Sequence, residues 1–264
     1  MMEVAKNHER YMVPGLERGL KLLSVFSRAT PELSLADLAR KLELSRSSVF
    51  RLAYTLEQLG YLRRTRTGYV LGPRVLTLGF DYLSSQELVE LARPELERLR
   101  DATGASAHLG VLDGTEVIYV AQAQGRGGLV SRVSVGTRLP AHATSMGRLL
   151  LGALSDTELA ERYPGPLEKY TAETPTTLDE LRSRIAQDRA RGYVASHGAY
   201  ERGIVAVAAP VFDRANAVIA AVNVSGPAAQ FDEALETTMK DSVRAAARAI
   251  SHQLGWQPRP GEAA

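Results

Sequence analysis

The chain has 264 residues, of which 45% are hydrophobic and none is cysteine, so it can bury a substantial core and is expected to form two domains. The missing cysteines exclude disulfides, thiolate nucleophiles and Cys-ligated zinc. No run of about eighteen apolar residues that could span a membrane occurs. The net charge is +2, but residues 1–80 carry 13 Lys/Arg against 7 Asp/Glu and the remainder carries 19 against 23. A basic first third is typical of a nucleic-acid face.

The first third has the pattern of a winged helix-turn-helix. A helix is expected over Gly15–Ser27, followed by a second over Ser34–Leu42 and a third over Ser45–Leu59. Both later helices begin with a capping Ser. Gly60 follows the third helix at the position where helices commonly end in a left-handed conformation. Two short strands around a basic turn, within residues 61–71, are expected to form the wing.

This arrangement places small polar and basic groups at the start of one exposed helix. A major-groove reader needs an unobstructed helix start, hydroxyls for phosphates and Arg for guanine edges or phosphates. The pattern therefore predicts contacts to double-stranded DNA from Ser34, Ser45, Arg46, Ser47, Ser48, Arg51, Arg64 and Arg66.

Two further helices are expected over residues 73–83 and 87–102, where apolar residues recur at helical spacing. They are predicted to connect the DNA-binding part to the rest of the chain. Their apolar faces could pair two subunits or pack only on their own domain.

From Ser106 the pattern changes to strands. Expected strands cover Ala107–Leu112, Val117–Ala121, Leu129–Val135, Gly192–Ala195, Ile204–Phe212 and Ala217–Val224. Expected helices cover Thr144–Leu154, Asp156–Tyr163, Leu178–Arg191 and Phe231–Leu254. This order predicts an α+β domain, with helices covering a mixed sheet.

The segment Gly136–Arg148 carries the most suggestive chemistry of this second part. A loop ending in Pro140-Ala141-His142 leads into a helix that starts with Thr144 and Ser145, so hydroxyls and free backbone N–H groups converge there. This favours a carboxylate or another small anion. An ordinary capped helix start would look the same.

A serine hydrolase is a different class of protein that the same segment allows. Residues 143–147 resemble the G-x-S-x-G elbow with its first Gly replaced. The preceding residues are predicted to form a loop rather than a strand, and the only later histidines are His197 and His252. We therefore expect no enzyme. The histidines also lack metal-ligand spacing, so no metal or cofactor is expected.

Several motifs, taken in order, make the chain resemble the IclR family of bacterial transcription factors over nearly its whole length. They are Leu16–Leu23, Leu38–Arg40, Leu56–Tyr61, Leu71–Leu76, Leu139–Ala143, Gly192-Tyr193, Val207–Val211 and Val224–Pro227. The resemblance implies a winged helix-turn-helix, a helical connector and a GAF-like effector domain. It also implies a cytoplasmic homodimer or homotetramer that acts on operator DNA.

The resemblance also implies an effector pocket where positions match the family pattern. The implied residues are Leu139, His142, Ala143, Ser145, Met146, Ser196, His197, Ala206, Asn223 and Ser225. The common acidic pattern after the Gly-Tyr pair is replaced here by Ser196-His197, which removes like-charge repulsion and should favour an anion. Residues 132–148 and 79–85 are similar to the subgroup that controls aromatic-acid catabolism, with protocatechuate, hydroxybenzoates and related β-ketoadipate pathway acids as effectors.

The resulting prediction is a transcription regulator whose operator binding responds to a small carboxylic acid, such as a hydroxybenzoate. Short keto or hydroxy acids as effectors, a serine hydrolase and an effector-blind DNA-binding assembly protein remain alternatives. The expected organisation is a tail at 1–12, the DNA-binding domain at 13–72, a linker helix at 73–86, the effector domain at 87–256 and a tail at 257–264.

Overall fold

The computed structural model describes residues 11–27, 29–84, 87–125, 133–230 and 233–257. The chain divides into two compact units, residues 1–85 and 86–264. Most of the two expected tails lies outside the described residues. No helix in the part of the chain that the structure describes is long and apolar enough to cross a membrane.

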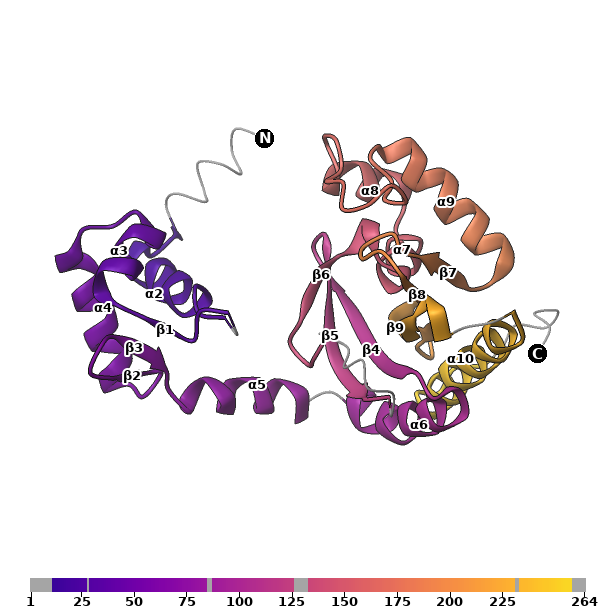
Figure 1. The fold of residues 1–264 in the computed structure, drawn as a ribbon, viewed down its shortest axis with the longest axis horizontal. Helices are drawn as coiled ribbons and strands as arrows, with labels where there is room; N and C mark the ends of the chain where they lie inside the picture. The colour runs from indigo at the N-terminus through magenta and orange to yellow at the C-terminus, as the bar shows by residue number, and fades with distance from the viewer. Residues whose placement is uncertain (1–10, 28, 85–86, 126–132, 231–232, 258–264) are drawn as a thin grey trace. The chain divides into compact units, whose positions relative to one another are not determined.

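The first unit is a winged helix-turn-helix (Figure 1). Its helices are α2 (Pro14–Ser24), α3 (Leu35–Leu42), α4 (Arg46–Gln58) and α5 (Arg74–Ser84), and its strands β1 (Glu32–Leu33), β2 (Leu62–Arg64) and β3 (Tyr69–Leu71) pair in the order β1-β3-β2. Leu22, Leu38, Val49 and Ala53 are fully buried between the helices. The first helix ends at Ser24, three residues earlier than expected, and β1 was not predicted, because two residues give no alternating pattern.

Capping fixes the two central helices. The Oγ atoms of Ser34 and Ser45 accept the backbone N–H of Asp37 and of Ser48, at 3.2 and 3.3 Å. Between the helices Glu43 takes a left-handed conformation (φ 53°), and Gly60 does so after α4 (φ 77°). The predicted caps and the predicted turn are therefore confirmed.

The second unit is built on a six-stranded sheet in the order β6-β5-β4-β9-β8-β7, in which every neighbouring pair runs antiparallel. The strands are β4 (Ser106–Asp113), β5 (Glu116–Ala123), β6 (Arg138–Pro140), β7 (Val194–His197), β8 (Ile204–Phe212) and β9 (Val218–Pro227). The α-helices are α6 (Glu87–Thr103), α7 (Ser145–Leu151), α8 (Asp156–Arg162), α9 (Leu178–Arg191) and α10 (Glu233–Gln253), and the 3-10 helices are η1 (Ala141–Ala143) and η2 (Ala228–Gln230). The predicted α+β class is confirmed, but the described sheet is antiparallel throughout and not mixed as expected.

Helices cover this sheet on both sides. Figure 1 shows α6 and α10 side by side on one side, with α7, α8 and α9 on the other. Met146 and Leu151 of α7 and Leu181 of α9 are fully buried in the core that these helices form with the sheet. The sheet is thus held in place from both sides, and the loops at its edge and α7 can form a site against it.

Three expectations about the second unit need correction, and the residues of a fourth are mostly not described. The strand expected at Leu129–Val135 falls largely outside the described residues. A strand that was not predicted forms at Arg138–Pro140, where it pairs with Glu116–Ile118 and the Arg138 guanidinium binds both Asp113 and Glu116. The segment Ala141–Ala143 is a 3-10 helix rather than a loop. Strand β7 begins at Val194, because Gly192 caps α9 in the left-handed conformation (φ 73°).

Candidate functional site

The start of α4 presents the polar surface that the sequence predicted. Ser45, Arg46, Ser47 and Arg51 are exposed and Ser48 is half-buried. The Ser45 hydroxyl lies 3.1 Å from that of Ser47 and 2.9 Å from that of Ser48. These groups therefore form one hydroxyl-rich helix start flanked by guanidinium groups.

The arginines of this face have no carboxylate partner among the described residues. Arg46 and Arg51 of α4, and Arg63, Arg64 and Arg66 of the wing, are exposed and form no ion pair there. Arg40 of α3 differs, because its Nη2 lies 2.5 Å from the Asp37 carboxylate. Unpaired cations can neutralise phosphates, whereas Arg40 is already neutralised in place.

One predicted DNA contact near this face needs correction, and two exposed aromatic residues there were not predicted. The Ser34 hydroxyl, predicted to contact DNA, is half-buried and donates to the Asp37 carboxylate at 2.6 Å, so its visible role is to cap α3. On α4, Phe50 and Tyr54 are exposed and their rings stack with centroids 6.3 Å apart. Their i, i+4 spacing in the sequence could have indicated that both rings lie on one side of the helix, where exposed aromatic rings often mark a contact surface.

The second unit contains a cavity of about 710 Å³, which is called the effector pocket here after the pocket that the sequence resemblance implies. It opens between the sheet, the start of α7 and the loop after β7. Its wall consists of Ser106, Tyr119, Val133, Thr137, Leu139, Ala143, Thr144, Ser145, Tyr170, Ser196, Gly198, Ala199, Tyr200, Glu201, Ile204, Ala206, Asn223, Ser225, Gly226 and Pro227.

Strand register creates the floor of the effector pocket. Ser106 of β4 pairs with Ser225 of β9, Ser225 with Ala206 of β8, and Ala206 with Ser196 of β7. These four small residues form one row across four strands. A row of small side chains leaves space above the sheet, and its three hydroxyls can each donate or accept a hydrogen bond.

Asn223 is held in place by a buried histidine. Nδ1 of His108 donates to Oδ1 of Asn223 at 3.0 Å, which leaves the Asn223 amide NH₂ as its donor group. Burial lowers the pKa of His108 to about 4, and the bond to Asn223 opposes this shift. His108 is therefore neutral near pH 7. Its Nε2 has no hydrogen-bond partner in the described part of the chain.

Three tyrosines supply the aromatic part of the wall. The rings of Tyr170 and Tyr200 lie with centroids 5.1 Å apart, and Tyr119 packs edge-on against His108 at 5.3 Å. Burial raises the pKa of Tyr119, so its phenol stays protonated. None of these tyrosines was predicted, because they come from three separate segments that only the fold brings together.

Seven of the ten predicted effector residues line the effector pocket, and three do not. Those that line it are Leu139, Ala143, Ser145, Ser196, Ala206, Asn223 and Ser225. Met146 is fully buried in the core, and Nε2 of His142 bonds to the Glu168 carbonyl at 2.9 Å. His197 is exposed and lies on a neighbouring hollow of about 200 Å³. The wall also contains the exposed carboxylate of Glu201, contrary to the expected replacement of an acid by His197.

The elbow-like segment around Ser145 has a packing explanation. A Cβ added to Gly147 would lie 2.1 Å from the Ala141 carbonyl oxygen, so glycine lets α7 approach η1. Thr144 caps α7 by accepting the Gly147 N–H at 3.2 Å. The preceding residues form η1 rather than the strand that a hydrolase elbow follows.

Among the described residues, no group of three His, Asp or Glu side chains could hold a metal ion.

Comparison with known proteins covers nearly the whole chain. Residues 15–66 match the IclR helix-turn-helix domain, and residues 80–252 match the bacterial transcriptional regulator IclR C-terminal domain. The Pca regulon regulatory protein of Pseudomonas putida is 37% identical over 90% of this chain and 83% of its own.

Two solved structures share the fold. A transcriptional regulator from Rhodococcus sp. RHA1 is 36% identical, with a TM-score of 0.81 over 92% of this chain and 99% of its own. An IclR homologue from Microbacterium hydrocarbonoxydans, solved in complex with 4-hydroxybenzoate, is 26% identical, with a TM-score of 0.79 over 91% of this chain and 99% of its own.

Proposed function

Since this chain belongs to the IclR family of bacterial transcriptional regulators, we propose that a small aromatic carboxylic acid, bound in the effector pocket, changes its affinity for operator DNA. The family and its named relatives are regulators and not enzymes. The first unit is the DNA-binding domain, and the second is the effector-binding domain.

The composition of the effector pocket carries this proposal. Hydroxyls of Ser106, Ser225 and Ser196 and the amide of Asn223 offer neutral donors for a carboxylate, and Tyr119, Tyr170 and Tyr200 offer aromatic surface for a ring. A cavity of about 710 Å³ lies within the range typical of small-molecule sites. A two-carbon keto acid would leave most of that aromatic surface without contact.

Two relatives support the aromatic class. One regulates the Pca regulon, and the other is a homologue whose structure contains 4-hydroxybenzoate. Since the exposed Glu201 carboxylate would repel an anion, we propose that the ligand carboxylate lies toward the serines and Asn223, with the ring toward the tyrosines.

On the DNA side, we propose that α4 enters the major groove and the wing contacts the backbone. Arg46, Ser47, Ser48 and Arg51 would contact bases or phosphates, and Arg64 and Arg66 would contact phosphates. We further propose that the protein acts in the cytoplasm as a homodimer or homotetramer, because paired recognition helices read paired half-sites. Ligand binding would then shift the population of operator-competent assemblies.

Calorimetric titration of the purified full chain tests the effector class. We expect 4-hydroxybenzoate and protocatechuate to bind more tightly than cyclohexanecarboxylate, which keeps the carboxylate and loses the aromatic ring, and than glyoxylate. Asn223→Ala should weaken aromatic binding by about 1–3 kcal/mol, since a hydrogen bond to a charged group is lost. Ala190→Ser, which is exposed and lines none of the described cavities, is the control.

The same ligands should then be added to gel-shift titrations on DNA selected by the protein from a random pool. A change in DNA affinity only with aromatic acids supports the proposal. Preference for glyoxylate would move the effector class to short keto acids, and identical DNA affinity with every acid would show an effector-blind second unit.

A further inference from the structure

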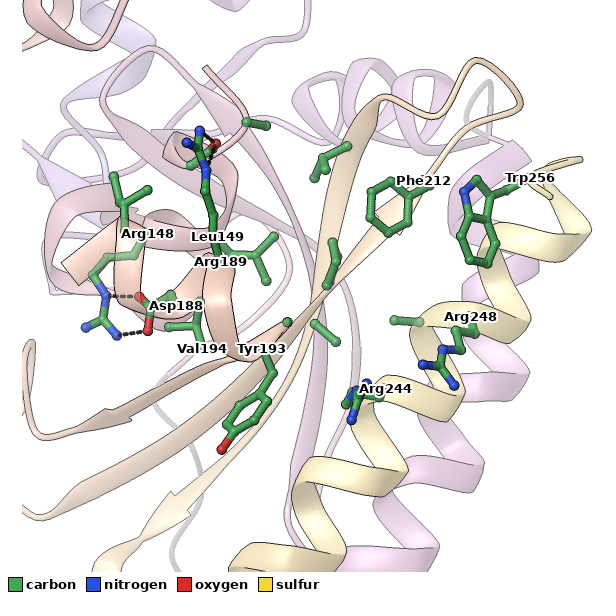
Figure 2. A pocket seen from close by; sticks show the side chains of 18 of the residues that line it. Arg148, Leu149, Asp188, Arg189, Tyr193, Val194, Phe212, Arg244, Arg248 and Trp256 are labelled. Carbon is green, nitrogen blue, oxygen red and sulfur yellow. Dashed lines mark hydrogen bonds and ion pairs between the residues drawn. The ribbon is translucent and has the colours of Figure 1, made fainter. Parts of the chain in front are cut away.

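A second cavity of the effector domain, of about 520 Å³, lies apart from the effector pocket and here is called the arginine pocket. Figure 2 shows it between α10, the ends of β8 and β9, and the α7–α9 layer. The two cavities share no lining residue. Neither the family resemblance nor the proposed function assigns a role to this second cavity.

Two half-buried arginines on one side of α10 form its charged wall. Arg244 and Arg248 are one helical turn apart, and both line the cavity. Neither has a hydrogen bond or an ion pair with any of the described residues. Holding two guanidinium groups partly out of water without a counter-charge is unfavourable, so an anion at this wall would be stabilised.

The acid in the cavity is already neutralised. Asp188 binds Nε of Arg148 at 3.0 Å (Figure 2), and Arg148 also donates to the Ala195 carbonyl at 2.9 Å. Arg189 donates to the Gly152 carbonyl at 2.9 Å. The lining residues therefore carry four arginines against one carboxylate.

The remaining wall is apolar and aromatic. Phe212 and Trp256 stack with centroids 5.3 Å apart and planes 16° from parallel. The indole N–H of Trp256 donates to Asn216 Oδ1 at 2.6 Å, which fixes its ring. Phe212 and Trp256 thus present a rigid apolar surface within the same cavity as the two guanidinium groups.

We propose that the arginine pocket is a second ligand site, for an organic anion with an apolar body. Its acidic head group pairs with Arg244 and Arg248, and its body lies against Phe212 and Trp256. The proposal does not rest on the identity of the ligand in the effector pocket.

The test uses 8-anilinonaphthalene-1-sulfonate as the probe, because Trp256 is the only tryptophan of the chain and lies in this pocket. We expect saturable quenching of Trp256 emission by one dye per chain. The uncharged analogue N-phenyl-1-naphthylamine should bind about ten-fold more weakly, the effect of losing a charge-assisted interaction of about 1.4 kcal/mol.

Variants separate the two cavities. Arg244→Gln/Arg248→Gln should weaken dye binding at least about ten-fold, while Arg244→Lys/Arg248→Lys keeps the charge and should retain most of it. Arg214→Gln, which removes an exposed arginine outside the cavity, and Asn223→Ala of the effector pocket should leave dye binding unchanged.

Equal affinity for the charged and uncharged dyes in the wild-type chain would overturn the proposal without any variant. So would loss of quenching in Asn223→Ala, because the dye would then occupy the effector pocket. A double Gln variant that keeps its dye affinity and changes its molar mass in light scattering would also overturn it, and would assign this face to contact between copies.

Discussion

The proposed DNA face and the effector pocket are built in opposite ways. The DNA face draws its groups from one short stretch, Ser45 to Arg66, and presents exposed cations that lack partners among the described residues. The effector pocket draws Ser106, Ser196, Ala206 and Ser225 from four strands, and its polar groups on the sheet are neutral. Local helix geometry builds the first site, and strand register builds the second.

This difference fits the two proposed ligands. Phosphates remain partly hydrated and are attracted over a distance, so exposed arginines suit them. A small acid must be desolvated and recognised by shape, so neutral donors on a rigid floor suit it. Four measurements test this difference.

The largest expected effect tests whether the two units are energetically separate. Leu38→Ala removes a fully buried side chain from the first unit and should destabilise that unit by about 2–5 kcal/mol. Thermal unfolding followed by Trp256 emission should stay unchanged, because Trp256 belongs to the second unit, while far-UV circular dichroism shows an earlier transition. The matched variant Leu181→Ala should instead lower the Trp256 transition. A common shift of both signals would mean that the units unfold together.

The next effect concerns the support beneath the effector pocket. His108 has a folded pKa of about 4 against an ordinary value of 6.5, so the unfolded chain binds the proton more tightly. The free energy of unfolding should therefore fall by up to about 3 kcal/mol as pH drops from 6.5 to 4, and the stability is fully present above 6.5. Urea titrations across this pH range should show that the free energy of unfolding depends less on pH in His108→Asn than in the wild-type chain. Equal slopes for both proteins would remove His108 as its source.

Substitutions of Arg51 and Arg64 test whether each residue of the proposed DNA face contacts a base or a phosphate. Arg51→Ala should weaken binding to selected DNA by about 1–3 kcal/mol if it contacts a base, whereas Arg64→Ala should weaken all sequences alike and lower the salt slope by about 1. Arg40→Ala is the control, because Asp37 already neutralises Arg40. Unchanged gel-shift affinity in Arg51→Ala would remove this residue from the interface.

The smallest effect separates stability from recognition at Ser45. Ser45→Ala removes a helix cap and should cost about 1 kcal/mol of the stability of the first unit. Ser45→Asp can cap α4 again, but it places a negative charge beside the DNA. Stability should therefore recover in urea titrations while DNA affinity falls. Recovery of both would exclude Ser45 from a phosphate contact.

The sequence alone predicted the caps at Ser34 and Ser45, the left-handed Gly60 and the exact limits of α9 and β8, because each depends on neighbours along the chain. Family motifs also identified seven residues of the effector pocket. The sequence did not show that Met146 and His142 turn into the core, because each lies beside a pocket residue in the chain and only the packing of α7 and η1 decides which side faces the cavity.

Tertiary structure alone decided the groups that meet across the sheet. His108 and Asn223 are 115 residues apart, and their bond exists because β4 and β9 pair with those two residues in register. Arg244 and Arg248 of α10 likewise share one cavity with Phe212 of β8 and with Trp256 only after folding. Periodicity along a chain reports which residues are buried, whereas strand register and helix packing determine what they touch once buried.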